Sequence, residues 1–423
     1  MTQVSGMRFA TVGAILIAIS FGLARFAFGL FVPQIRDALG LSADLIGIIA
    51  ALPLISFVIV SLVAPLITKY FGARNTTVLS AAFAAFGLVL ISQAIGPISL
   101  GLGALACGIS TGLMMPALTS AMQALVDRSI HGRVSSVMNA GTSIGVALSG
   151  PAVLFFMNSW RYAYFAFALL AIVAVFLAWF LIPSVSRVTP SNAAPPGKIT
   201  AQRAVRLFKL FVFAFAMGFV AAAYWTFGPD LVTQLGALAP GQSGWLWLAV
   251  GVAGLGGAII SDIADRNNPA ITHALMLMML TTSLTLLAAS PDQIYLAVFS
   301  ALVFGLAYMS LTGLYLMTGI RLLPGRLSLG PVLPFVACAL GQAIGSPVIG
   351  FLVSEFGYAA SFSIFATIGI FASLLSPFYP VHIEDDTQVP EEETGLQAAF
   401  GYQLRDDEGE PLPTQAEASE LDR

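Results

Sequence analysis

The chain alternates long apolar stretches with short polar segments along nearly all of its first 380 residues. A helix needs about 20 mostly apolar residues to cross the ~30 Å hydrocarbon core of a bilayer. Most of these stretches lack a polar face, which is typical of helices in lipid and unlike the alternating, roughly ten-residue strands of a membrane barrel. Twelve stretches are long enough: 8–35, 43–67, 75–95, 98–126, 133–157, 160–183, 206–234, 242–262, 269–290, 293–322, 329–354 and 359–380. The pattern predicts an all-α membrane protein with 12 transmembrane helices.

The composition excludes a soluble protein. Hydrophobic residues make up 58% of the chain and charged residues 9%, against about 45–50% and 25% in soluble domains. The acids are unevenly placed, because 13 of the 21 lie from Glu384 onward, which leaves 16 basic and eight acidic residues before that point. A basic membrane body with an acidic tail makes the lipid bilayer an expected partner and excludes nucleic acid.

The basic residues predict how the helices are oriented. With the N-terminus in the cytoplasm, 15 of the 18 Lys and Arg residues fall in cytoplasmic segments, Arg36 and Arg161 fall outside, and Arg25 lies within the membrane. This distribution follows the positive-inside rule and requires an even number of crossings. We expect a multi-pass protein of the cytoplasmic (inner) membrane with both termini in the cytoplasm.

Two polar segments divide the chain. Residues 184–205 are rich in Pro, Ala, Ser and basic residues, and are expected to form a cytoplasmic linker between an N-terminal six-helix bundle (1–183) and a C-terminal one (206–381). Residues 382–423 are polar, acidic and proline-containing, which predicts a disordered cytoplasmic tail. A solvated end without a specific role is the simplest interpretation of this tail.

Three pairs of short motifs recur in one order, at offsets of 193 to 200 residues. Gly-rich helices can produce such matches by chance, but the shared order favours an internal duplication. Two parallel repeats in a transporter place the substrate site between them, near the middle of the membrane. The pairs are Phe28-Gly29 with Phe227-Gly228, Gly132-Arg133 with Gly325-Arg326, and Gly141/Gly145 with Gly341/Gly345.

The loops after the second helix of each half resemble the signature of the major facilitator superfamily, which is typically G-x-L-A-D-R-x-G-R/K. Residues 261–266 (S-D-I-A-D-R) keep the A-D-R core. Residues 65–74 keep the F-G-A-R end, but Lys69 stands where the acid belongs. The resemblance covers about residues 8–380 and implies two six-helix repeats that act as a transporter.

In that family the loop is a cytoplasmic latch between helices. The resemblance therefore implies a gating role for Asp265 and Arg266, and Lys69 and Arg74 occupy the corresponding loop of the first half. Residues 22–29 (G-L-A-R-F-A-F-G) are similar to the G-x-G-R-F-A-Y start of the YbfB-like branch.

The helix predicted at 133–157 carries Gly141, Gly145, Gly150 and Pro151, which is loosely similar to the antiporter motif of drug exporters. The Pro is displaced from its expected place after Gly145. Small residues that allow helices to approach closely are a sufficient explanation of this pattern.

Arg25 is the most informative single residue. It lies 17 residues after Arg8, roughly 25 Å along a helix, and so near the middle of the first span. A charge there costs about 2.5–3.5 kcal/mol on insertion scales and should face a polar cavity or a partner. A guanidinium matches a carboxylate with two hydrogen bonds, which favours an anchor for an anionic substrate. The alternative is that Arg25 bonds carbonyls or polar side chains and fixes helix packing.

No Asp or Glu lies deep within the predicted spans. Asp230 is 24 residues after Arg206, roughly 36 Å along the same helix, and is expected as a gate at the outer interface. Exporters of cationic drugs and proton-coupled sugar importers usually carry a membrane-buried carboxylate, so its absence favours an anionic or neutral cargo. Any coupled proton would travel with the anion or be carried by Asp230.

Other polar and aromatic residues near the expected midplane are candidates for the substrate site, with packing between helices as the alternative for each. Tyr308 and Thr312 share a helix face because they are four residues apart. The candidates are Phe28, Met115, Asn139, Tyr224, Trp225, Tyr308, Thr312 and Gln342.

We expect no cofactor and no metal site. Cys107 and Cys338 lie in apolar segments, and His131, His273 and His382 are scattered over predicted loops and helix ends. The chain contains no G-x-x-x-x-G-K-[ST] loop for ATP.

These patterns predict a secondary active transporter, not an enzyme, that moves a small solute by alternating access, with an organic anion as the expected cargo. A gradient of an ion or of the substrate would drive it, and we expect a monomer. Two alternatives stand beside this prediction: an exporter of hydrophobic or drug-like compounds, and a non-transporting membrane receptor or scaffold that acts through the acidic tail.

Overall fold

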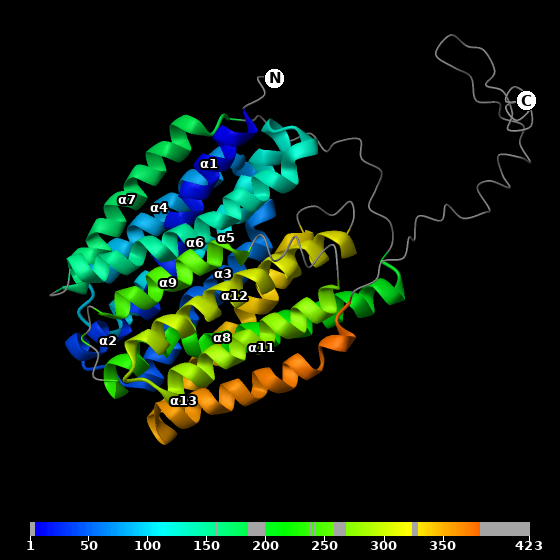
Figure 1. The fold of residues 1–423 in the computed structure, drawn as a ribbon. Coiled ribbons are helices and arrows are strands. Elements are labelled where there is room, and N and C mark those ends of the chain that lie inside the picture. Colours follow the sequence, from blue (N-terminus) through cyan, green and yellow to red (C-terminus); the bar gives the residue numbers. More distant parts are fainter. Residues whose placement is uncertain are drawn as a thin grey trace, which may run out of the picture. The chain divides into compact units, whose positions relative to one another are not determined.

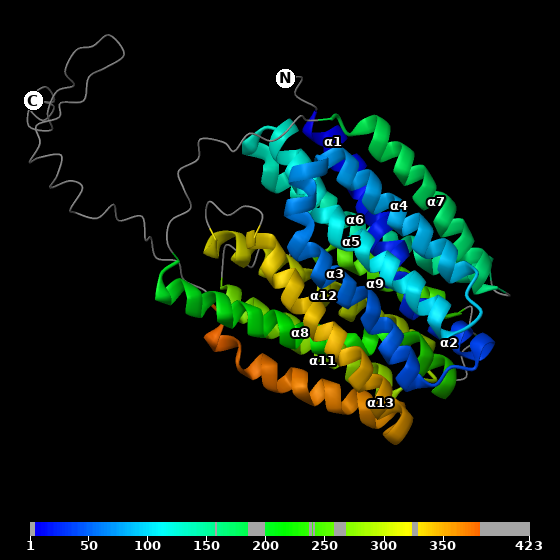
Figure 2. The same cartoon turned by 180° about the vertical axis from the view of Figure 1, so that it is seen from behind.

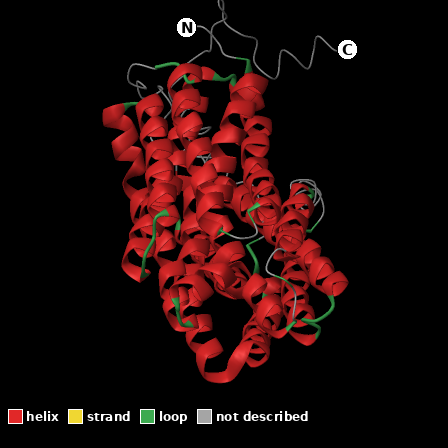
Figure 3. Cartoon of the chain, turned by 90° about the vertical axis from the view of Figure 1, so that its left-hand side faces the viewer, coloured by secondary structure: helices red, strands yellow, loops and turns green. Residues whose placement is uncertain are grey.

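The computed structural model describes residues 5–156, 159–184, 199–236, 239, 242–257, 268–323 and 329–380. Every regular element among these residues is a helix (Figure 3). The acidic tail from His382, most of the predicted linker, and the latch residues Asp265 and Arg266 lie outside the described residues.

We group the described helices into two halves of the chain. Residues 6–181, the first half, contain α1 (Gly6–Ile17), η1 (Ala18–Phe26), α2 (Ala27–Leu39), α3 (Ala43–Phe71), α4 (Ala73–Ser92), α5 (Pro97–Leu125), η2 (Arg128–Ile130), α6 (His131–Phe155) and α7 (Trp160–Leu181). Residues 201–378, the second half, contain α8 (Ala201–Leu235), α9 (Ser243–Leu255), α11 (Pro269–Ala289), α12 (Ile294–Leu322), α13 (Leu329–Leu374) and η4 (Ser376–Phe378).

The described helices are consistent with the 12 predicted spans. Among the described residues, ten segments are long and apolar enough to cross a membrane, one of which is Gly6–Leu39, formed by α1, η1 and α2 together. The short α9 lies at the start of the predicted eighth span. Gly357, at φ 76° and ψ 174°, breaks α13 into two helices, and this left-handed conformation suits a residue without a β-carbon. α8 begins five residues before its predicted start at 206.

The first crossing is irregular in its middle. Residues 18–26 form a π-helix, at whose end the Ala27 amide bonds to the Gly22 carbonyl five residues earlier. Arg25 lies in the last turn of this segment. Because π-helices are rare and occur frequently at functional sites, this turn draws attention to Arg25.

The two G-x-x-x-G motifs make equivalent contacts in the two halves. In α6, Gly141 and Gly145 face the backbone of α1 and η1, and in α13, Gly341 and Gly345 face the backbone of α8. A β-carbon at any of the four would lie 2.0 to 2.7 Å from a backbone oxygen. The repeated motif therefore serves the same close helix packing in both halves.

The halves meet along α3 with α13 and α6 with α9 (Figures 1 and 2), and α2 of the first half also packs against α8 of the second. We call the end of the helices at which Gly6 lies the N-terminal end, and the end at which α2 stops the far end. At the far end a β-carbon on Gly47 would be 2.4 Å from the Ser346 oxygen, and one on Gly150 would be 2.5 Å from the Gly244 oxygen. The halves are therefore in backbone contact at the far end.

Replacing Gly145 by Leu should lower the stability of the folded protein, because the new side chain would have to push α6 away from η1. Overpacking typically costs 1–3 kcal/mol, and a backbone oxygen cannot turn aside as a side chain can. We expect the apparent melting temperature of the purified protein to fall by several degrees. The matched control is Gly132→Leu in the same helix, where a β-carbon meets nothing within 4 Å. Equal melting temperatures for the two variants would contradict the packing role of Gly145.

Candidate functional site

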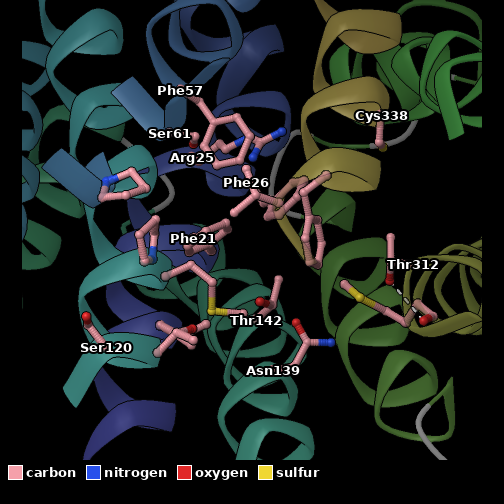
Figure 4. A pocket seen from close by; sticks show the side chains of 18 of the residues that line it. Phe21, Arg25, Phe26, Phe57, Ser61, Ser120, Asn139, Thr142, Thr312 and Cys338 are labelled. Carbon is pink, nitrogen blue, oxygen red and sulfur yellow. Dashed lines mark hydrogen bonds between the residues drawn. The ribbon is translucent and has the colours of Figure 1, made fainter. Parts of the chain in front are cut away.

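A pocket of about 260 Å³ lies between the two halves near the middle of the first crossing (Figure 4). It is formed by α1, η1, α3, α5 and α6 from the first half and by α12 and α13 from the second. Five of the residues that the sequence singles out line it: Arg25, Met115, Asn139, Tyr308 and Thr312.

The pocket extends from Arg25 toward the N-terminal end of the helices. Its wall includes Thr68 in the last turn of α3 and Gln123 in the last turn of α5, and both of these helices end on that side. In the opposite direction, at the far end, the two halves are in backbone contact at the glycines. The described pocket therefore extends from Arg25 toward one end of the helices.

Arg25 contacts the second half of the chain through its guanidinium. Its Nη2 donates a hydrogen bond of 3.0 Å to Oε1 of Gln342. Its Cζ lies 4.9 Å from the centre of the Phe26 ring and 5.0 Å from that of Phe57, within the range of a cation–π contact. The guanidinium therefore faces a side-chain amide, two rings and the pocket, rather than lipid or backbone oxygens.

Gln342 is itself held in place. Its Nε2 donates a hydrogen bond of 2.8 Å to the Tyr308 hydroxyl, which lies 3.8 Å from the sulfur of Cys338. The amide oxygen and the amide nitrogen of Gln342 are thus both hydrogen-bonded, which keeps the oxygen directed at Arg25. The Arg25–Gln342 bond joins the two halves of the chain directly at the pocket.

A second, smaller pocket of about 40 Å³ also contacts Arg25, and it is lined by three further predicted residues, Phe28, Trp225 and Gln342. The Trp225 ring lies 4.4 Å from the ring of Phe26. Its indole Nε1 is buried and has no hydrogen-bond partner. Arg25 and Phe26 line both pockets, so they form the partition between them.

Tyr224 lies in neither of these two pockets. It is fully buried, stacks on Phe304 at 4.0 Å between ring centres, and accepts a hydrogen bond of 3.5 Å from Ser300. Its observed contacts are packing contacts within the second half of the chain.

Asp230 lies near the far end of α8, where the residue count along the helix predicts it, but it is fully buried. Arg36 in α2 donates to its carboxylate, and so does the hydroxyl of Tyr358, which follows the break in α13. Arg36 also lies 2.6 Å from the Tyr358 hydroxyl. The contact between Arg36 and Asp230 is the one ion pair within the described residues, and it connects the first half to the second.

The sequence alone does not predict the partners of Asp230. Arg36 stands out only as one of two basic residues that the topology places on the outer side. Nothing in the sequence singles out Tyr358.

The predicted gating residues of the first half lie near the N-terminal end and do not contact each other in any described interaction. Lys69 is exposed in the last turn of α3, and Gly72, at φ 81°, turns the chain directly into α4. The guanidinium carbon of Arg74 lies 4.5 Å from the ring centre of Trp179. Their counterparts Asp265 and Arg266 fall outside the described ranges.

His273 is fully buried, although it lies close to the start of a helix. It belongs to α11, with Nδ1 2.7 Å from the Ser376 hydroxyl and Nε2 2.8 Å from that of Tyr315. Its ring stacks on Tyr379 at 4.7 Å. The cluster attaches η4 to the second half and does not line either pocket.

Known proteins share this architecture. The family described as the Major Facilitator Superfamily matches residues 14–328. No curated protein matches the sequence. The structure is similar to that of a mutant of the nucleoside transporter NupG (TM-score 0.70, 14% identity, 88% of this chain and 99% of that one).

Two further solved structures are similar. One is the human organic anion transporter TETRAN (TM-score 0.66, 15% identity, 88% of this chain and 100% of that one). The other is a D-xylose-proton symporter (TM-score 0.70, 17% identity, 88% and 96%). At these identities the likeness concerns the fold alone. Because the family match extends over most of the chain and the helices follow the same plan, this multi-pass membrane protein belongs to the Major Facilitator Superfamily, whose members are carriers rather than enzymes.

Proposed function

We propose that this protein is a secondary active transporter that moves a small organic anion across the cytoplasmic membrane by alternating access. The observation that carries the proposal is the position of Arg25. It is the only charged residue among the described residues that line the larger pocket. It also lies in the middle of the first crossing.

The chemistry of the guanidinium supports an anionic cargo. A guanidinium has five N–H donors, and Gln342 takes one hydrogen bond from Nη2. The single ion pair among the described residues involves Arg36 instead. A carboxylate that enters the pocket would give Arg25 an anionic partner. A planar guanidinium can bind a carboxylate with two parallel hydrogen bonds.

The state of the two ends supports alternating access. The pocket extends toward the N-terminal end, whereas glycine contacts and the Arg36–Asp230–Tyr358 cluster join the halves at the far end. The distribution of basic residues supports a cytoplasmic N-terminus and a cytoplasmic C-terminus, so the open side would be the inside. Opening the far end requires the Arg36–Asp230 pair to separate, which makes this cluster the outer gate.

The proteins of similar structure do not identify the cargo of this chain, so the residues of the pocket must indicate it. These proteins are a nucleoside transporter, an organic anion transporter and a sugar symporter, so one fold serves several cargoes. Residues 22–29 support a place in the YbfB-like branch of the superfamily.

Export of hydrophobic compounds is the second candidate, because the pocket is rich in rings and thioethers, among them Phe21, Phe57 and Met115. An uncharged compound would use these surfaces but would not offset the charge of Arg25. The two candidates therefore differ in whether transport depends on that charge.

Replacing Arg25 by Ala should reduce uptake of small carboxylates into proteoliposomes, because the substrate would lose its charged partner. A hydrogen bond to a charged group contributes about 1.5–3 kcal/mol, so we expect kcat/KM to fall about ten- to a hundredfold. Arg25→Lys should retain uptake with a raised KM, since it keeps the charge but loses the planar fork.

Arg161→Ala is the matched control for Arg25. This arginine also lies over a ring, that of Trp160, but it bonds the Ala94 carbonyl at the far end, away from the pocket. Uptake should be nearly unchanged. Unaltered carboxylate uptake by Arg25→Ala would make Arg25 a packing residue, and uptake of neutral hydrophobic compounds alone would favour the exporter.

Replacing Asp230 by Asn should open the far end more often, because the cluster with Arg36 and Tyr358 would lose its charge. A cysteine at Asn139, placed in a background without Cys107 and Cys338, reports whether the pocket is open at the N-terminal end. We expect the rate of its labelling by an impermeant maleimide, added from the N-terminal side, to fall at least twofold.

Asp127→Asn provides the comparison for the gate. Asp127 is an exposed carboxylate next to η2, bonded to the Ser129 amide at 2.8 Å, and it belongs to no contact between the halves. Its neutralisation should leave the labelling rate unchanged. If Asp230→Asn also leaves the rate unchanged, the Arg36–Asp230 pair does not control the far end.

A further inference from the structure

We propose that the substrate is an aromatic monocarboxylate whose ring carries a polar group opposite the carboxylate, and that the hydroxyl of Ser61 recognises this group. The proposal rests on the proposed function, because it takes Arg25 as the partner of the carboxylate. It specifies the number of charges on the substrate, the shape of its uncharged part and a second group of the protein that binds it.

The charge count favours a single carboxylate. Besides Arg25, the polar residues that line the described part of the larger pocket carry hydroxyl and amide groups, as in Asn139, Thr142 and Gln123. A second carboxylate in this pocket would face no cation. Burying an unpaired charge is far more costly than burying a hydrogen-bonded polar group, so dianions should be rejected.

The shape of the pocket favours a flat ring. Phe26 and Phe57 both lie about 5 Å from the guanidinium carbon, and the rings of Phe21, Phe335 and Tyr308 also line the pocket. Ring pairs gain energy beyond simple burial when they meet edge to face or offset. The volume of about 260 Å³ is below the roughly 300–1,000 Å³ typical of pockets for drug-sized ligands, which suits a single ring.

Ser61 offers a hydrogen-bonding group that no atom of the described residues uses. Its side chain is only 3% exposed, lines the pocket, and has no hydrogen-bond partner for its hydroxyl (Figure 4). A buried serine in a helix usually bonds the carbonyl four residues earlier. The Ser61 carbonyl also lacks its usual amide donor, because position 65 is a proline. The Ser61 hydroxyl is thus an unused hydrogen-bonding group at the pocket wall.

The position of Ser61 matches the far side of a ring bound at Arg25. Phe57, which contacts the guanidinium, is four residues earlier in α3, so Ser61 lies on the same face of the helix, roughly 6 Å farther toward the N-terminal end. This step is comparable to the span of a benzene ring with its substituents. A hydroxyl in the para position would come within reach of Ser61.

Thr68 provides a matched control on the same helix. Its hydroxyl is also buried, unpartnered and part of the pocket wall. It lies 11 residues from Phe57, roughly 16 Å along α3, which is too far for a single ring held at Arg25. Ser61 and Thr68 therefore differ in distance from the guanidinium and not in chemistry.

Equilibrium binding to the purified full-length protein, measured by calorimetry, tests the inference with four probes. They are benzoate, 4-hydroxybenzoate, the dianion terephthalate and the aliphatic hexanoate. We expect 4-hydroxybenzoate to bind about three- to tenfold more tightly than benzoate, as one added hydrogen bond predicts. Hexanoate should bind less tightly than benzoate, and terephthalate at least tenfold less tightly.

Two variants locate the second point of recognition. Ser61→Ala should bind benzoate and 4-hydroxybenzoate equally, whereas Thr68→Val should keep the preference for 4-hydroxybenzoate. The probe series on the unaltered protein tests the class of substrate even if a variant fails to fold.

The outcomes separate this inference from the proposed function. If none of the carboxylates binds, or if Arg25→Ala binds them as tightly as the unaltered protein, the proposed organic-anion function fails. If carboxylates bind through Arg25 but terephthalate or hexanoate binds as well as benzoate, the aromatic monocarboxylate is wrong and the proposed function stands. A preference for 4-hydroxybenzoate that survives Ser61→Ala overturns the role of Ser61.

Discussion

A positive charge in the middle of a lipid-embedded helix is the constraint on which the rest of this structure depends. Arg25 must be solvated by the protein or by a ligand, because hydrocarbon cannot do it. The protein supplies one amide oxygen, from Gln342, and two ring faces. The π-helical turn in which Arg25 lies, the partition between two pockets and the contact between the halves all surround this one guanidinium.

The same constraint links binding to movement. The oxygen that Arg25 contacts belongs to the other half of the chain, so a ligand that takes its place also removes a bond between the halves. The far end has a different type of connection, in which backbone contacts at glycines are combined with a buried ion pair. A carrier needs both kinds of contact to be reversible, since interfaces with two discrete arrangements allow alternating access.

The sequence was sufficient for the fold but only for part of the site. Apolar length predicts the crossings, since each must span the bilayer, and the helices follow that order. Residue counting along single helices predicts how far along their helices Arg25 and Asp230 lie. It cannot place side chains around a helix or across the two halves. Tyr224 was therefore named as a candidate although it lies outside both pockets, and the roles of Arg36, Tyr358 and Ser61 were not identified. Those contacts depend on how distant helices pack.

We propose that Arg25 binds the negative group of the cargo. A structure of the full-length protein with 4-iodobenzoate would show this, because the scattering of iodine fixes both the position and the direction of the ligand. We expect the carboxylate within hydrogen-bonding distance of the Arg25 guanidinium and the iodine directed toward the N-terminal end. A ligand bound elsewhere, with Arg25 still bonded to Gln342 and facing no negative group, would contradict it.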